Sequence, residues 1–249
     1  MIRSGNEDNF TVDLNGSRGI FIVADGMGGH AAGEVASEMA VQILQRDLAS
    51  VSTLDGEQAS TLTADTLRKA NRAIHDRTLT EVDKQGMGTT ASVLLIAGTR
   101  YLIGQVGDSR VYLMRDGQLS QLTKDHSYVQ EQVDAGFLTP EQARYHPYSN
   151  VITRCVGASP DVEPDVYSGE IRTGDIFLVA SDGLTGMVDD RRLGQLLGSR
   201  AEPDRKVQAL ISEANGRGGL DNITAIIVQV VDADAPPADA ATVEMRKLG

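Results

Sequence analysis

Four aspartates lie beside short apolar runs in four separate parts of the sequence. Asp25, Asp108 and Asp182 each follow such a run, in the strings FIVADGMGGH, LIGQVGDSR and FLVASDG, and Asp221 precedes one in GGLDNITAIIV. Each run is rich in Val, Ile and Leu, which predicts a short buried strand. If these strand ends converge, the carboxylates cannot all stay ionised without a cation among them. A cluster of oxygen ligands suits Mg²⁺ or Mn²⁺, so this placement indicates a divalent metal site.

A Gly-rich turn, DGMGGH, begins at Asp25 and separates a predicted strand from a predicted helix. Such a turn can be purely structural, or it can present a carboxylate and a main-chain carbonyl to one metal, because glycine allows close approach. Gly26, Gly28 and Ala31 also match the dinucleotide-binding pattern G-x-G-x-x-A. Against that alternative, Asp25 would repel a pyrophosphate, no strand is expected after the helix, and the acidic residue at the right distance, Asp47, falls inside the helix.

The N-terminal string RSGNED combines one arginine with two carboxylates, as Arg3, Glu7 and Asp8. One interpretation is a flexible terminus of mixed charge. The functional alternative is an arginine that binds a phosphate beside carboxylates that orient metal-bound waters, since the planar guanidinium contacts phosphate oxygens in pairs.

Several other chemistries lack their motifs. A cysteine-based phosphatase loop needs Arg six positions after the cysteine, but Asp161 stands six positions after Cys155. The chain has no G-x-S-x-G elbow and no G-x-x-x-x-G-K-[ST] loop. None of the histidines has HExxH spacing; they are His30, His75, His126 and His146.

The composition sets broad limits on the class of protein. The 249 residues are 41% hydrophobic, enough for one domain over residues 1–231, and residues 232–249 are rich in Ala, Asp and Pro and are expected to be a disordered tail. The net charge of −12 argues against nucleic acid as a partner. A single cysteine, the absence of an 18-residue apolar stretch and the lack of a secretory leader predict a cytoplasmic protein that does not span a membrane.

The hydrophobic periodicity predicts grouped strands and separate helices. Strands are expected at 19–24, 89–97, 101–106, 110–115, 118–122, 176–180 and 223–231. Helices are expected at 31–48, 62–83 and 203–215, with two short ones in 126–146, the second capped by Thr139-Pro140. Residues 147–165 hold three prolines and no period, and are expected to be irregular. This order favours an α+β fold with antiparallel sheets.

The ordered set of strings resembles the metal-dependent protein phosphatases of the PP2C (PPM) family in their bacterial form. The matching strings are RSGNED, FIVADGMGGHAAGEVAS, MGTTASVLLI, VGDSRVYL, LTKDHSYVQEQVDAG, HPYSNVITRCVG, FLVASDGLTGMV and GGLDNITAIIV, which span residues 3 to about 231. The resemblance implies a four-layer α-β-β-α sandwich, in which two antiparallel sheets are flanked by helices. It also implies a mobile flap beside the site, within residues from about 126 to 165.

The same resemblance implies a set of metal ligands. Asp25 would bridge two Mn²⁺ or Mg²⁺ ions, and the carbonyl of Gly26 would bind one of them. Asp182 and Asp221 would bind the other. Asp108 would hold a third, weaker ion together with Asp182.

Further roles follow from the resemblance. Glu7 and Asp8 would act mainly through water, and Arg3 would contact the substrate phosphate. Eukaryotic members have a histidine, proposed as the general acid, where Met27 stands in this chain, as in bacterial relatives. The proton donor is then either a metal-bound water or His30.

The implied activity is hydrolysis of phosphoserine and phosphothreonine in proteins by direct attack of a metal-bridging hydroxide. Expected partners are phosphorylated proteins, including Ser/Thr kinases and their substrates, and a monomer is expected. Family members usually have an edge strand before the arginine at position 3. That departure keeps open a second hypothesis, a pseudophosphatase that acts as a regulatory binding module.

Overall fold

The computed structural model describes residues 5–233, apart from the side chains of residues 30 and 31. Two sheets form its centre, and in each sheet the neighbouring strands are antiparallel. The first has the order β1 (Asp8–Asn15), β2 (Arg18–Met27), β4 (Ala91–Ala97), β5 (Arg100–Val106) and β8 (Asp165–Glu170), with β3 (Gly88–Thr89) on β2. The second has the order β10 (Ala225–Gln229), β9 (Ile176–Ala180), β6 (Arg110–Arg115) and β7 (Gln118–Gln121).

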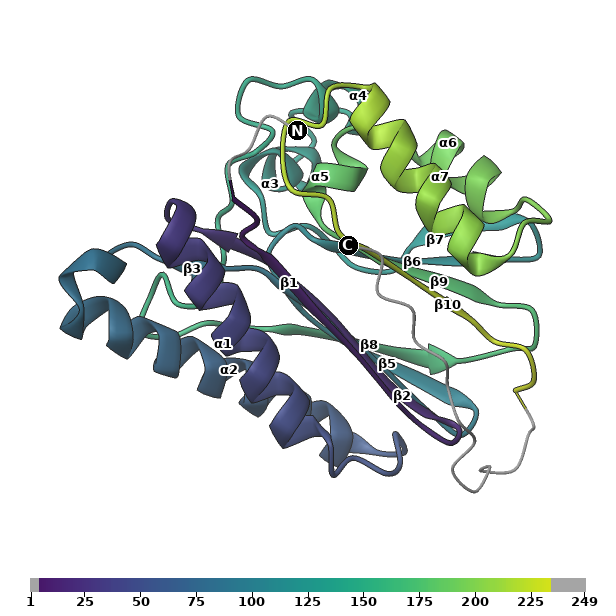
Figure 1. Ribbon diagram of the computed structural model, residues 1–249, viewed down its shortest axis with the longest axis horizontal. Coiled ribbons are helices and arrows are strands. Elements are labelled where there is room, and N and C mark those ends of the chain that lie inside the picture. The colour runs from purple at the N-terminus through teal and green to yellow at the C-terminus, as the bar shows by residue number, and fades with distance from the viewer. Residues whose placement is uncertain (1–4, 234–249) are drawn as a thin grey trace.

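Helices cover the outer face of each sheet (Figure 1). The long helices α1 (His30–Leu48) and α2 (Glu57–Thr80) pack on the first sheet, while α6 (Asp190–Leu197) and α7 (Pro203–Gly216) pack on the second. The short elements are η1 (Val82–Lys84), α3 (Tyr128–Asp134), α4 (Pro140–Arg144) and α5 (Asp182–Thr185). The predicted four-layer α-β-β-α sandwich is therefore confirmed.

Three hydrophobic cores fill the three interfaces between the four layers. Alternate residues of each central strand point to opposite faces. On β2, Ile20 and Ile22 join the core under α1 and α2, while Phe21 and Val23 join the core between the sheets. On β9, Phe177 belongs to the core between the sheets, and its neighbours Ile176 and Leu178 belong to the core under α6 and α7. Burial on both faces explains why these strands are continuous apolar runs in the sequence.

The predicted cap at Thr139 is confirmed, and an Asp-Gly pair forms a hairpin turn. Thr139 caps α4 with a full capping box, and Pro140 occupies the first helical position. The β6–β7 hairpin turns at Asp116 and Gly117, which have φ of 52° and 78°. Positive φ at both central residues is what a tight two-residue hairpin requires, so the Asp-Gly pair sets this turn.

The prediction missed strands β1 and β8, helix α6 and the two short elements η1 and α5, and it misplaced the ends of α2. Strands β1 and β8 lie at the two edges of the first sheet, where one side is exposed and the composition is more polar than in the centre. Helix α6 was also missed; Asp189 caps it by accepting a hydrogen bond from the Arg192 backbone N–H at 2.9 Å. Helix α2 begins at Glu57, five residues before the predicted start, and ends at Thr80, three residues before the predicted end.

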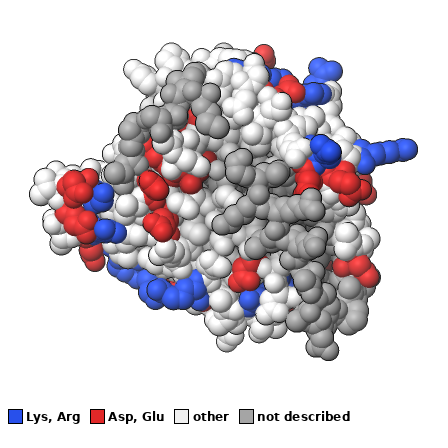
Figure 2. Space-filling view, in the orientation of Figure 1, with Lys and Arg blue, Asp and Glu red and all other residues white. Residues whose placement is uncertain are grey.

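The surface in Figure 2 mixes charges of both signs: the visible Lys and Arg side chains lie among Asp and Glu rather than in one broad basic area. Within residues 5–233, no helix has the length and apolar character needed to cross a bilayer. The predicted disordered tail, residues 232–249, lies outside the described residues except for its first two. Of these, Ala233 packs against the core between the sheets and its backbone N–H donates to Oγ1 of Thr173 at 3.0 Å.

Candidate metal centre and active site

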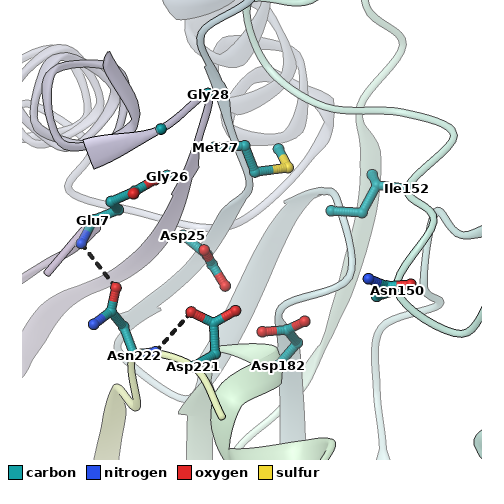
Figure 3. Close-up of a pocket in the computed structure, with 11 residues that line it drawn as sticks. Glu7, Asp25, Gly26, Met27, Gly28, Asn150, Ile152, Asp182, Asp221 and Asn222 are labelled. Carbon is teal, nitrogen blue, oxygen red and sulfur yellow. Dashed lines mark hydrogen bonds between the residues drawn. The ribbon is translucent and has the colours of Figure 1, made fainter. Parts of the chain in front are cut away.

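Acidic side chains from distant parts of the chain meet at one end of the sandwich. Asp25 lies near the end of β2, Asp182 begins α5 directly after β9, and Asp221 stands in the turn before β10. In Figure 3 these three carboxylates point into a common space, with Asn150 and Ile152 on the opposite wall. The pocket has a volume of about 300 Å³, and its lining also includes Glu7, Gly26, Met27, Gly28, Gly29 and Asn222.

The backbone of Asp25 is held by two neighbouring threonines. Its N–H donates to Oγ1 of Thr90 at 2.9 Å, and its carbonyl accepts from both Oγ1 of Thr89 and the Thr90 N–H at 2.9 Å. These contacts satisfy the main chain of a residue at the end of a buried strand. The strand end is thereby fixed, and the side chain projects into the pocket (Figure 3).

Asp8 joins the two sheets beside the pocket. It stands opposite Asp25 in the β1–β2 register and is 7% exposed. Its Oδ2 accepts hydrogen bonds from Oγ of Ser181 at 2.9 Å and Oγ1 of Thr224 at 2.6 Å. Ser181 directly precedes Asp182, and Thr224 follows the Asp221 turn. The Asp8 carboxylate therefore holds the segments of Asp182 and Asp221 next to the strand that carries Asp25.

Asn222 ties the N-terminal segment to the Asp221 turn. Its Oδ1 accepts from the Glu7 N–H at 2.9 Å and its Nδ2 donates to the Gly5 carbonyl at 3.0 Å, while its own N–H donates to Oδ1 of Asp221 at 2.8 Å (the first and last of these are dashed in Figure 3). Sequence reasoning missed this role. The available signal was the place of Asn222 directly after Asp221, since Asn side chains often bond to nearby backbone in turns.

The carboxylate of Glu7 lies against the backbone of α1 at Gly33. A Cβ added at Gly33 would overlap Oε2 of Glu7 and would come 2.9 Å from the Gly26 carbonyl carbon. The same region of backbone also contacts Ser37, whose Oγ donates to the Glu7 carbonyl at 2.6 Å. The glycine therefore makes room for an acidic side chain at the edge of the pocket.

We expect Gly33→Ala to lower metal-dependent turnover about tenfold, because the new methyl group displaces Glu7. Ala ordinarily stabilises a helix by about 0.5–1 kcal/mol relative to Gly. A loss of stability in Gly33→Ala would therefore come from the overlap of the new methyl group with Glu7. Gly194→Ala in α6 is the matched control, since its Cβ would meet its nearest neighbour, Leu119, at an ordinary 3.5 Å. Steady-state rates and thermal midpoints of both variants check this; equal rates would contradict the role of Gly33.

Burial and mutual repulsion raise the pKa of the clustered carboxyls. Burial raises the pKa of Asp25 well above its usual value, and the charges of Asp8, Asp182 and Asp108 raise it further. The pKa of Asp108 rises to about 8, mainly through burial and then through Asp182. The pKa of Asp8 rises to about 6 through burial, although hydrogen bonds from Thr224 and Ser181 oppose the shift. A cation in the pocket would remove this cost.

The donor atoms fit a hard divalent metal. Oδ1 of Asp8 and Oδ1 of Asp108 are buried and make no hydrogen bond to any described residue, and the pocket lining offers further carboxylates and the Gly26 backbone. Oxygen donors of this kind suit Mg²⁺ and Mn²⁺. Within residues 5–233, however, no three acidic, His or Cys side chains form a finished metal cage.

Asp108 borders a second, larger groove that adjoins the pocket. The groove has a volume of about 820 Å³ and shares Asn150, Asp182 and Asp221 with the pocket. It runs between α3, α4 and the start of α6, and its lining includes Tyr145, 79% exposed. The predicted flap, residues 126–165, thus forms one side of a groove that leads to the acidic cluster.

The structure brings most of the predicted site residues together. Glu7, Asp25, Gly26, Asp182 and Asp221 line one pocket, with Asp8 and Asp108 next to it. Arg3 and the side chain of His30 lie outside the described residues, so their roles stay predictions. Asn150, Ile152 and Asn222 complete the lining and were not assigned a role from the sequence.

This fold and this acidic pocket define a metal-dependent phosphatase, and comparison with known proteins agrees. A family model described as protein phosphatase 2C matches residues 3–214. The chain is 40% identical over 230 residues to the serine/threonine phosphatase stp of Listeria monocytogenes, covering 92% of this chain and 91% of that protein. It is 40% identical over 239 residues to the serine/threonine protein phosphatase PstP of Mycobacterium tuberculosis, covering 94% of this chain and 44% of that longer protein.

Solved structures give the same result. The S. agalactiae serine/threonine phosphatase superposes with a TM-score of 0.85 at 39% identity, covering 92% of this chain and 95% of that one. The catalytic domain of PstP in complex with two manganese ions superposes with a TM-score of 0.82 at 38% identity, covering 93% and 94%. The chain belongs to the protein phosphatase 2C family. It is a metal-dependent protein serine/threonine phosphatase of the bacterial type.

Proposed function

We propose that the pocket around Asp25 holds two Mn²⁺ or Mg²⁺ ions, with Asp25 between them, Gly26 contributing its carbonyl to one, and Asp182 and Asp221 on the other. The observation that carries this assignment is the convergence of these three aspartates from separate strand ends (Figure 3). Asp108 and Asp182 together would hold a third, weaker ion. When bound, the two cations would supply Lewis-acid chemistry that lowers the pKa of a nearby water, and the phosphate ester would then be hydrolysed directly, with no covalent phosphoenzyme.

The protein's own residues then orient the reaction. Glu7 and Asp8 would accept hydrogen bonds from waters around the ions. Ser181 and Thr224 hold Asp8 in place by donating to its Oδ2. Arg3 neutralises charge on the phosphoryl oxygens as they approach the acidic pocket. His30, at the start of α1, or water supplies the proton to the departing serine or threonine oxygen.

The substrates are phosphorylated proteins, and we propose Ser/Thr kinases and their targets among them. A groove of about 820 Å³ adjoins the pocket, and we propose that it receives the polypeptide on either side of the phosphorylated residue. We also propose that the protein is a monomer and that it is cytoplasmic; the single cysteine supports the second of these proposals, because it fits a reducing compartment.

Hydrolysis of a phosphothreonine peptide is expected to require Mn²⁺ and to disappear in excess chelator, because the carboxylates alone repel an anionic phosphate. Phosphate release with and without chelator measures this, and activity that survives chelation would contradict the mechanism.

Turnover of p-nitrophenyl phosphate separates an active enzyme from a pseudophosphatase, since a binding module with the same fold would not hydrolyse it.

A further inference from the structure

His126 lies between β7 and α3, and it contacts the loop that carries Asp108. It is 4% exposed. The Gly107 N–H donates to Nδ1 of His126 at 3.1 Å, and the His126 N–H donates to the Gly107 carbonyl at 3.0 Å. The imidazole must be neutral to accept a hydrogen bond at Nδ1, and burial, followed by the charge of Arg154, lowers its pKa in agreement with that state.

Gly107 determines where Asp108 points. Its φ of +105° is open to few other residues, and an added Cβ would overlap the side chain of Thr90. Its carbonyl also accepts from Nε2 of Gln105 at 3.1 Å. The Gly107 N–H, however, has His126 as its partner, so the imidazole completes the set of contacts that fixes this strained turn.

The same histidine begins the flap. The His126 carbonyl accepts from the Thr153 N–H at 2.9 Å, and Ser127 forms an antiparallel bridge with Ile152. These contacts hold residues 126–127 beside residues 152–153, and we call this pair of segments the neck of the flap. Ile152 lines the candidate metal pocket. Movement at the neck would therefore reach both the pocket wall and, through His126, the Asp108 turn.

The other ring nitrogen lies beside the base of the flap. Nε2 of His126 is 3.3 Å from Oδ2 of Asp165, at the start of β8, and Oδ1 of Asp165 pairs with Nη1 of Arg154 at 2.8 Å. The proton of the neutral ring is placed on Nε2 by the hydrogen bond at Nδ1. The ring therefore spans from the first sheet to the Asp108 turn.

We propose that His126, next to the neck of the flap, is a positioning residue that fixes the Asp108 turn through the Gly107 N–H, so that Asp108 binds metal tightly only when this contact is made. This inference rests on the proposed function for its effect on metal use, but its structural part concerns the Gly107–His126 contact alone. The alternative is a histidine that only fills space in the interior, which is common for a buried ring.

Two isosteric variants distinguish these roles. His126→Asn keeps an amide oxygen close to the position of Nδ1, so it preserves an acceptor for the Gly107 N–H and loses the group near Asp165. His126→Gln places its amide near the position of Nε2 and leaves Gly107 without an acceptor. His75→Gln, on α2, is the control for a histidine outside the site.

In chelator, amide hydrogen exchange at Gly107 is expected to be fast in His126→Gln and close to wild type in His126→Asn. In Mn²⁺ titrations by calorimetry and by activity, His126→Gln is expected to need about tenfold more Mn²⁺ for half-saturation, while His126→Asn stays within about threefold of wild type. Circular dichroism and thermal midpoints establish that both variants fold.

Equal behaviour of the two His126 variants, or loss of the fold in both, would overturn the positioning role and leave only packing. A wild-type protein without Mn²⁺-dependent turnover would refute the proposed function instead. The Gly107 exchange comparison still tests the contact in that case, because it is made without metal. The two failures are therefore distinguishable.

Discussion

Asp25→Asn is expected to reduce Mn²⁺-dependent hydrolysis of a phosphopeptide by on the order of 10³-fold or more while the fold is retained. The carboxylate would lie between two cations, and an amide of the same shape supplies neither its charge nor its second anionic oxygen. Asp182→Asn is expected to have a comparable effect. Steady-state kinetics at saturating Mn²⁺ measure the loss, and circular dichroism confirms the fold.

In chelator, Asp25→Asn is expected to be more stable than wild type, although its turnover is lower. The pKa of Asp25 is raised by burial and by the charges of Asp8, Asp182 and Asp108, so its ionised form is disfavoured in the folded protein without metal. Removing that charge should raise the thermal midpoint of Asp25→Asn above that of wild type at pH 8.

Asp47→Asn is the matched control for that prediction, since Asp47 pairs with Arg46 and Lys69 on the surface and its pKa is lowered to about 2. This control is expected to change neither turnover nor stability by much. Wild-type rates in Asp25→Asn, or a lower midpoint than wild type in chelator, would show that the cluster is not a metal site.

The pH dependence of stability is expected to reverse its sign when metal is added. In the folded protein the pKa is raised from 3.8 to about 6 for Asp8 and to about 8 for Asp108. Between pH 3.8, where these groups titrate in the unfolded chain, and about pH 8, the folded state binds more protons than the unfolded state. The free energy of unfolding therefore falls as pH rises over this range. The destabilisation caused by the raised pKa values of Asp8 and Asp108 is absent below about pH 4, where both states are protonated, and complete above about pH 8, where both are ionised.

With Mn²⁺ bound the same carboxyls must be ionised, so metal affinity, and with it stability, should increase with pH over this range. At a metal concentration of about 100 times the dissociation constant, binding alone adds about 2.7 kcal/mol. Thermal midpoints at pH 5, 6, 7 and 8, in chelator and in Mn²⁺, measure both slopes.

Asp108→Asn serves as the internal control for the pH experiment, because removing one of the titrating groups should flatten the slope in chelator. Midpoints that rise with pH in the metal-free protein would mean that the acidic cluster does not carry the raised pKa values. Identical slopes with and without Mn²⁺ would mean that the ion binds elsewhere.

The sequence determined the central strands and the long helices of the fold, because burial on one or both faces leaves a hydrophobic pattern. Strand β9 was predicted with its observed bounds, Ile176–Ala180, and β6 likewise, Arg110–Arg115. The edge strands β1 and β8 were not predicted, because only one face of each is covered and, apart from Asp8, their side chains are half-buried or exposed. Amphipathic edges with few apolar residues give too weak a pattern to separate from loops.

The residue types of the site were also available in the sequence, since carboxylates next to buried strands are few and conspicuous. What only the tertiary structure decided is how they are held. The contacts of Asp8 with Ser181, of Asn222 with Glu7 and of Gly107 with His126 join residues separated by 173, 215 and 19 positions. No local periodicity encodes such pairs, because each depends on how two sheets and their loops pack against one another, and that packing follows from burial summed over the whole chain.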